Sequence, residues 1–196
     1  METPKVFIHL LPGGIMPKRQ TDGAIGFDAH VRAIVSPSEI DPLNPKLRKI
    51  LFDFQNIPDD PTIAGHVLWQ PKRGDTANEL VYRMNPGESL LVGIGFVTEM
   101  PFPMFYWVSP RSGLSSRYGI IVTNAPGTVD PDYRGEAGVL VWNRALTTFD
   151  LRHGMRIAQI IFQWAIIPGF KTVDVYKHLR DTVRGIGGFG STGLNK

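Results

Sequence analysis

The last residues of the chain combine bare backbone, hydroxyl groups and a cation. Residues 184–196 read RGIGGFGSTGLNK, and glycine dominates them. Exposed backbone N–H groups, the hydroxyls of Ser191 and Thr192 and the guanidinium of Arg184 are donors that suit a phosphate. No lysine follows the glycines, so the segment is not a Walker A loop. Phe189 could close over a flat group such as a base, and a plain flexible tail is the alternative.

A second anion-binding pattern is SPRSGLSSRYG, residues 109–119. A short helix is expected to begin after Arg111. Backbone N–H groups at a helix start bind anions, and here the Ser112 hydroxyl and the Arg111 guanidinium would add to them. A tight turn that carries a surface arginine is the alternative reading.

The segment NAPGTVDPDYRGE, residues 124–136, has the pattern of a β-hairpin with Asp130, Asp132 and Tyr133 in its turn. A carboxylate at a strand end can act as a general base toward water, and a tyrosine ring can pack against a sugar. Ordinary turn chemistry would also select these residues.

Polar residues interrupt the apolar strand pattern GMRIAQIIF, residues 154–162. A polar side chain in a buried strand needs a partner. Gln159 is therefore either paired within the core or directed at a ligand, and the sequence leaves both possibilities open.

Short strands separated by frequent glycines and prolines are expected to position these groups. The 196 residues include 21 glycines and 16 prolines, which favour many short strands over long helices. Six strand patterns lie within residues 88–167, and their close spacing predicts a β-barrel or a jelly-roll sandwich. One long helix is also expected, because Leu43, Leu47, Ile50, Leu51 and Phe54 recur at helical intervals.

Composition excludes several classes of function. The net charge of +3 comes from scattered basic residues, which does not indicate a nucleic-acid groove. The absence of cysteine excludes a disulfide framework, a thiolate zinc site and a cysteine nucleophile. No apolar run is long enough for a membrane helix, and no signal-peptide pattern opens the sequence, so a soluble cytoplasmic protein is expected.

Taken together and in order, five segments resemble the five motifs of the trimeric dUTPase family. They are GFDAHVRA, SPRSGLS, NAPGTVDPDYRGEAGVLVWN, GMRIAQIIF and RGIGGFGSTG. The resemblance implies an all-β, distorted jelly-roll barrel with one short helix after the second motif. It also implies a barrel domain over residues 1–183 and a mobile arm over residues 184–196 that closes the active site.

The implied reaction is the hydrolysis of dUTP to dUMP and pyrophosphate by a homotrimer whose sites draw on neighbouring subunits. Asp130 would activate the water that attacks the α-phosphate, and Tyr133 would stack on the deoxyribose. The other implied substrate contacts are Asn124, Gly127, Thr128 and Val129 at uracil, Arg111, Ser112, Gly113 and Gln159 at the phosphates, and Arg184, Phe189, Gly190, Ser191 and Thr192 from the arm.

The resemblance also implies Mg²⁺, carried mainly by the triphosphate and water molecules rather than by a carboxylate cluster. Asp28 would either contact the water shell of this metal or be a buried structural carboxylate paired with Arg156, and the structural role is favoured.

The chain departs from the family pattern in two places. The gap between the first and second motifs is unusually long and predicts an insertion within residues 37–86, with the expected helix inside it. Pro126 and Thr128 differ from the commonest hairpin residues of the family, so the sequence does not determine the shape of the uracil pocket there.

Two other functions remain as alternatives. A dCTP deaminase shares the fold, but its catalytic glutamate would stand where this chain has Leu140, which cannot transfer protons. A regulatory nucleotide-binding protein could use the insertion as its interaction surface. The predicted catalytic positions are all filled, which favours an enzyme.

Overall fold

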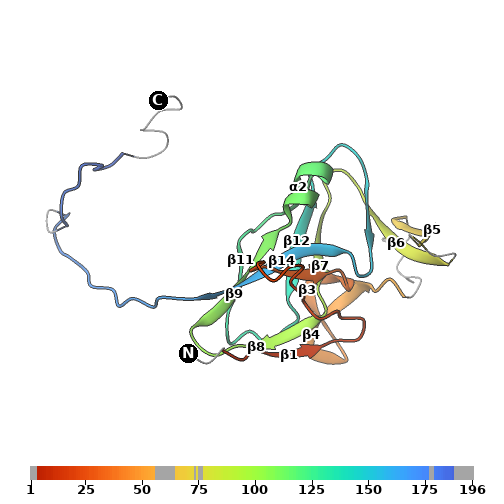
Figure 1. Cartoon of the computed structure of the whole chain (residues 1–196), viewed down its shortest axis with the longest axis horizontal. Helices are drawn as coiled ribbons and strands as arrows, with labels where there is room; N and C mark the ends of the chain where they lie inside the picture. Colours follow the sequence, from red (N-terminus) through yellow and green to blue (C-terminus); the bar gives the residue numbers. More distant parts are fainter. Residues whose placement is uncertain (1–3, 56–64, 73, 75–76, 177–178, 188–196) are drawn as a thin grey trace. The chain divides into compact units, whose positions relative to one another are not determined.

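The computed structural model describes residues 4–55, 65–72, 74, 77–176 and 179–187 (Figure 1). The chain divides into two units, Met1–Ala165 and Ile166–Lys196, and each is described by itself. The first unit contains all the named strands and the helix α2. No helix among the described residues is long and apolar enough to cross a membrane.

Antiparallel strands build the first unit, and their pairing joins segments that are far apart in the sequence. β1 (Phe7–Leu10) pairs with β8 (Phe96–Glu99). A second sheet has the order β10 (Ile120–Val122), β12 (Gly138–Asn143), β7 (Ser89–Gly93), β3 (Ala33–Asp41), β4 (Asn44–Phe52). A third has the order β11 (Gly127–Val129), β9 (Met104–Pro110), β14 (Arg156–Trp164), β2 (Phe27–His30). The last joins β13 (Phe149–Arg152), β6 (Asn78–Met84) and β5 (Val67–Pro71).

The core forms because strand residues alternate between the two faces of each sheet. In β9, Met104, Tyr106 and Val108 are buried while the residues between them are more exposed. Successive side chains of a strand point to opposite faces, so one face of β9 lies in the core. There Tyr106 meets Phe162 of β14 edge to face, with ring centroids 5.4 Å apart. The all-β fold expected from the sequence is confirmed.

The prediction of a helix over residues 43–54 is wrong, because residues 44–52 form strand β4. β3 and β4 make a hairpin with a turn at Pro42 and Leu43. The Asp41 carboxylate accepts a hydrogen bond from the Leu43 N–H at 2.9 Å, which is an Asx turn. Pairing with β3, which in turn pairs with β7, overrides the helical spacing of the leucines, and Leu43 is almost fully exposed.

The short helix expected after the second motif is confirmed as α2 (Ser112–Tyr118). Leu114 anchors it to the core. Gly119 ends it in the left-handed conformation with φ 68°, which a residue without a Cβ adopts most easily. At its other end the helix follows β9 almost directly, because β9 ends at Pro110 and α2 begins at Ser112.

A buried ion pair links the three chain segments around β7. Both oxygens of the Glu136 carboxylate accept hydrogen bonds from the Arg32 guanidinium, at 2.7 and 2.5 Å, and one also accepts from the Gly95 N–H at 2.8 Å. Gly93 lies so close that a Cβ there would stand 2.5 Å from a Glu136 oxygen. The backbone thus encloses the pair and both carboxylate oxygens accept hydrogen bonds, which is the condition under which a buried charge is tolerated.

A second buried polar group, His30 at the end of β2, lacks such matching. Its Nδ1 is buried and has no hydrogen-bond partner among the described residues. Burial lowers the pKa of His30 below its ordinary value of 6.5, although nearby Asp28 acts in the opposite direction. The neutral imidazole is therefore the form that the fold prefers.

Replacing Glu136 by Gln should lower the free energy of unfolding by about 3 kcal/mol, because the buried Arg32 would lose its counter-charge. Guanidinium-chloride unfolding measures this loss. Glu39→Gln is the control, since Glu39 pairs with Lys49 on the surface and its loss should cost less than about 0.5 kcal/mol. Equal losses in the two variants would contradict a special role for the buried pair.

Stability should fall as the pH drops below about 6.5, partly through His30. The unfolded state binds a proton at this pH, whereas the folded state resists it until its lowered pKa is reached. The His30→Gln variant should therefore show a shallower decline in the free energy of unfolding between pH 6.5 and 5. His9→Gln, at an exposed position of β1, is the matched control. Identical pH slopes for His30→Gln and the parent chain would refute the assignment.

Candidate active site

The turn after β11 holds the predicted base and the predicted sugar platform together. The Tyr133 N–H donates to the Asp130 carbonyl at 3.2 Å, and its phenol donates to the Glu136 carbonyl at 3.1 Å. The ring lies directly over Gly135, where a Cβ would collide with it. Asp130 is exposed, so its carboxylate is open to water.

Asp130 and Tyr133 line a pocket of about 210 Å³, called here the hairpin pocket. Its other lining residues are Arg48, Leu91, Thr128, Val129, Glu136, Ala137 and Gly138. Asn124 and Gly127, the remaining predicted uracil contacts, pack against each other, because a Cβ on Gly127 would lie 3.0 Å from the Asn124 amide nitrogen. Four of the predicted site residues, Thr128, Val129, Asp130 and Tyr133, therefore share this pocket, whereas Asn124 and Gly127 are not among its lining residues.

The predicted phosphate-binding residues gather around α2. Arg111, Ser112 and Gly113 line a pocket of about 690 Å³, called here the helix pocket. The rest of its lining comes from Leu114, Arg117, Tyr118, Phe149, Met155 and Arg156. Three guanidinium groups thus face one cavity beside a helix start, an arrangement suited to a polyanion.

Asp28 positions two of these guanidinium groups. One carboxylate oxygen accepts a hydrogen bond from Arg111 Nε and the other from Arg156 Nη1, both at 3.1 Å. Asp28 is 1% exposed. The ion pair with Arg156 suggested by the sequence is present, and Arg111 is an additional partner. Because both oxygens are engaged, this geometry supports the structural role of Asp28 over contact with a metal's water shell.

Gln159 lies in β14 beside Asp28. In the sheet register it stands opposite Asp28 of β2 and Ser109 of β9. Its amide carbon would be 3.2 Å from a Cβ on Gly26, so a glycine there leaves room for this side chain. Paired residues of antiparallel strands share a face, which puts Gln159 on the same face as Asp28.

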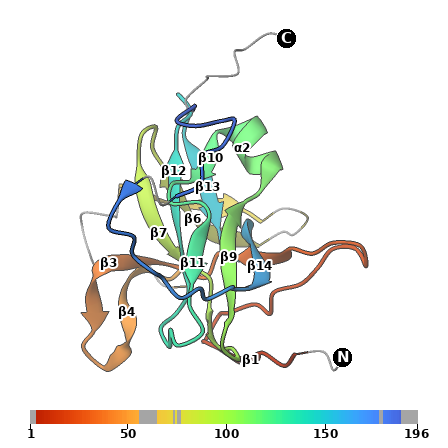
Figure 2. The same ribbon diagram turned by 90° about the vertical axis from the view of Figure 1, so that its left-hand side faces the viewer.

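The hairpin pocket and the helix pocket have different lining residues. Figure 2 shows α2, which lines the helix pocket, at one end of β9. Val129 is opposite Tyr106, and Asp130 follows it, whereas Arg111 follows the last residue of β9. Arg111 is five positions beyond Tyr106 along the chain, which at the rise of a strand is about 17 Å. The two pockets share no lining residue. A single copy of the unit therefore presents two separate pockets, called here the two half-sites of the predicted active site.

The arm residues are only partly described. In the second unit, Arg184 Nε donates to the Gly187 carbonyl at 2.8 Å, and the Gly185 N–H donates to the Thr182 carbonyl at 3.0 Å. Phe189, Gly190, Ser191 and Thr192 lie outside the described residues. The part that the arm plays at the site stays a prediction.

Sequence reasoning missed several residues of the two pockets. Arg156 was noticed only as a possible partner of Asp28, although an arginine in an apolar strand was the available signal. Arg117 had the signal of α-helical spacing from Gly113 and Leu114 on the side that lines the helix pocket. No sequence signal indicated that Arg48 would line a pocket, because its segment was expected to be a helix. Among the described residues, no group of three or more His, Asp or Glu side chains is arranged to hold a metal ion.

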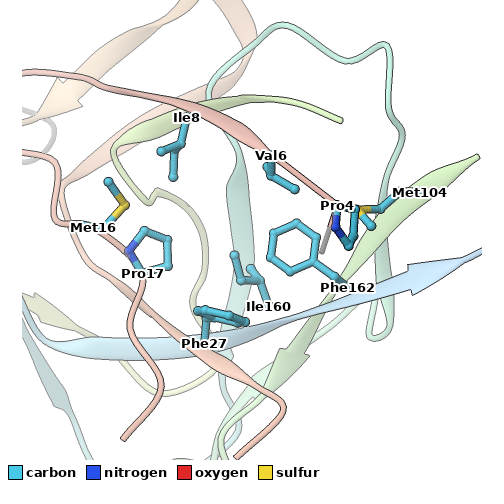
Figure 3. A pocket seen from close by; sticks show the side chains of 9 residues that line it. All are labelled: Pro4, Val6, Ile8, Met16, Pro17, Phe27, Met104, Ile160 and Phe162. Carbon is cyan, nitrogen blue, oxygen red and sulfur yellow. The ribbon is translucent and has the colours of Figure 1, made fainter. Parts of the chain in front are cut away.

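A further pocket, of about 340 Å³, lies between the N-terminal segment and the sheet of β9, β14 and β2 (Figure 3). Its lining is apolar throughout: Pro4, Val6, Ile8, Met16, Pro17, Phe27, Met104, Ile160 and Phe162. It offers no cation or polar side chain to a phosphate, so it is not a candidate for the predicted chemistry.

Solved structures with a similar fold come from staphylococcal phages. A point mutant of the dUTPase of Staphylococcus bacteriophage 80alpha, solved with dUpNHpp, superposes with a TM-score of 0.67 at 17% identity, covering 98% of this chain and all of that one. A point mutant of the dUTPase of phage phi11, described with a structural Mg(II) ion, gives a TM-score of 0.59 at 15% identity over 88% of this chain and 99% of that one. At such identities the likeness concerns the fold.

The sequence comparison finds relatives with higher identity. A deoxyuridine 5'-triphosphate nucleotidohydrolase of Heliobacterium modesticaldum is 36% identical over 190 residues, which cover 95% of this chain and 94% of the relative. The same-named protein of Gloeothece citriformis is 48% identical over 109 residues, covering 56% of this chain and 73% of that one. The family model described as dUTPase matches residues 79–193. On these grounds the chain belongs to the dUTPase family.

Proposed function

We propose that this chain hydrolyses dUTP to dUMP and pyrophosphate, with Asp130 as the base. The observation that carries the proposal is the exposed Asp130 carboxylate, fixed on the same turn as Tyr133 and lining the hairpin pocket with it. A water held by Asp130 attacks the α-phosphorus, and the carboxylate takes its proton. The bond from the α-phosphorus to the bridging oxygen breaks, and pyrophosphate leaves with that oxygen. Positioning provides much of the effect, because an ordinary carboxylate is a weak base at neutral pH.

The hairpin accounts for the choice of nucleoside. Tyr133, held over Gly135, stacks on the deoxyribose and leaves no room for a 2′-hydroxyl. Asn124 and the backbone of Gly127, Thr128 and Val129 read the uracil edge. Cytosine is refused because its donors and acceptors would leave buried partners unmatched.

The helix pocket accounts for the triphosphate. Arg111, Ser112, the Gly113 amide and Gln159 hold the phosphate chain, and the Asp28 carboxylate fixes the Arg111 guanidinium in place. Arg184, Gly190, Ser191 and Thr192 come in with the arm, and Phe189 covers the uracil. Closure of the arm expels water from around the phosphates.

Mg²⁺ would fit this site with its oxygen ligands supplied by the triphosphate and by water molecules. It would offset part of the charge that develops on the phosphate oxygens. The donor groups that face the helix pocket are guanidinium and hydroxyl groups, which bind phosphate rather than metal. The metal therefore would arrive with the substrate.

The separated half-sites favour a closed cyclic assembly, and the resemblance to the trimeric dUTPases makes a homotrimer the proposed one. The α-phosphate must contact Asp130 while its own phosphate chain contacts Arg111, but β9 keeps these two residues apart in one copy. If Asp130 of one subunit faces Arg111 of the next, closed cyclic symmetry completes every site.

The two alternative functions find less support. Leu140 stands in the middle of a sheet, opposite Leu91 of β7, and provides no titratable group for a deaminase. A regulatory role of the insertion could coexist with hydrolysis, but the filled catalytic turn favours an enzyme.

Asp130→Asn should abolish turnover while leaving the fold intact. The amide cannot accept the proton of the attacking water, so pyrophosphate release from dUTP with Mg²⁺ should drop by about 10³-fold or more. Turnover of dCTP, dTTP and UTP, measured in parallel on the parent chain, checks the substrate. Ammonia release from dCTP would favour the deaminase, and binding of dUTP without any hydrolysis would favour the regulatory protein.

Mixing two inactive variants should restore activity if the site forms between copies. Asp130→Asn damages one half-site and Ser112→Ala the other, so each homotrimer retains little activity. After joint unfolding and refolding in equal amounts, about a quarter of the sites combine two intact halves. Steady-state turnover of the mixture measures this. A mixture no more active than the mean of its components would mean that each site lies within one subunit.

A further inference from the structure

The hairpin of β3 and β4 forms one wall of the hairpin pocket. Arg48 of β4 lines this pocket together with Asp130 and Tyr133. Next to it, a second cavity of about 570 Å³ separates residues 38–40 and 46–48 from residues 132–135. Figure 2 shows the β3–β4 hairpin on the same side of the molecule as the loop that follows β11. The predicted insertion therefore reaches the candidate active site.

The Arg48 guanidinium has donors to spare. Its Nη1 donates to the Pro37 carbonyl at 2.6 Å, which holds the side chain against β3. No carboxylate among the described residues forms an ion pair with it. A guanidinium carries five N–H donors, so most of them are open to a ligand.

Two other arginines nearby make more contacts within the protein than Arg48 does. Arg32 is paired with the carboxylate of Glu136, which itself lines the pocket. Arg134 donates to the Pro131, Tyr133 and Thr98 carbonyls and lies 4.0 Å from Glu99. Of the residues that line the hairpin pocket, Arg48 is the one cation.

A further cation at this place, beside the Mg²⁺ and the neighbouring subunit's Arg111 proposed above, would assist the proposed chemistry. A carboxylate base beside a phosphate sets two negative groups against each other, and this repulsion weakens binding unless a positive group offsets it. The guanidiniums of Arg111 and Arg156 belong to the helix pocket and not to the hairpin pocket. Arg48 comes from the same chain as the base.

We propose that Arg48 is a substrate-binding residue that contacts the phosphate attached to the sugar. The inference rests on the proposed function and deepens it, since it assigns the insertion a direct part in binding the nucleoside monophosphate portion of the substrate. The guanidinium pairs with a non-bridging oxygen of that phosphate, and its bond to Pro37 fixes the direction of approach.

Binding of dUMP and of deoxyuridine by NMR titration of the full chain tests this proposal. The two ligands differ only in the phosphate, so Arg48→Gln should weaken dUMP binding by about tenfold and leave deoxyuridine binding unchanged. Arg48→Lys should fall between the parent and Arg48→Gln for dUMP, because it keeps the charge and loses the planar fork. Lys49→Gln is the matched control. Lys49 is the next residue of β4, so it points to the opposite face, where it pairs with Glu39 at 3.1 Å.

Each outcome decides something. Equal weakening of both ligands by Arg48→Gln would mean that Arg48 only shapes the wall, and no weakening would mean that it does not touch the ligand; either overturns the proposal. Phosphate-dependent binding through Arg48 without hydrolysis of dUTP would uphold this inference and overturn the proposed function. Failure of the parent chain to bind either ligand would overturn both.

Discussion

Both edges of β9 are hydrogen-bonded, one to β11 and the other to β14. A strand that is paired on both sides cannot slide, because a shift of one residue would turn Met104, Tyr106 and Val108 out of the core. The register of this strand therefore fixes where the hairpin turn begins and where α2 starts. The positions of the proposed base and of the proposed phosphate-binding groups follow from the packing of the core beneath them.

Carboxylates take three different roles in this fold, and their surroundings decide which. Glu136 is enclosed and matched by Arg32, so it stabilises the junction around β7. Asp28 is equally buried but divides its oxygens between two guanidiniums of the helix pocket, so it orients groups that a ligand can reach. Asp130 is exposed and remains open for chemistry. The same functional group is structural, orienting or reactive according to burial and partners.

Much of the fold could be predicted from the sequence because local patterns and tertiary pairing agree. The strands around residues 88–164 alternate clearly, and the PRSG segment starts a helix as expected. The helix predicted for residues 43–54 was wrong because leucines at helical intervals also fit a hairpin. The Asp41 and Asn44 side chains accept backbone hydrogen bonds that favour a turn, and this outweighed the helical spacing. The position of Arg48 in the hairpin pocket could not be predicted either, because it depends on the pairing of β4 with β3 and of β3 with β7. The ordered motifs indicated candidate site residues, but their separation along β9 could be seen only from the strand register.

The distance between the half-sites along β9 has a consequence for how such a protein behaves at low abundance. If no copy holds a complete site, turnover belongs to the assembly, and an isolated subunit is folded yet idle. Activity per molecule would then fall on dilution below the concentration at which subunits associate. A cell that makes little of the chain would lose activity faster than it loses protein.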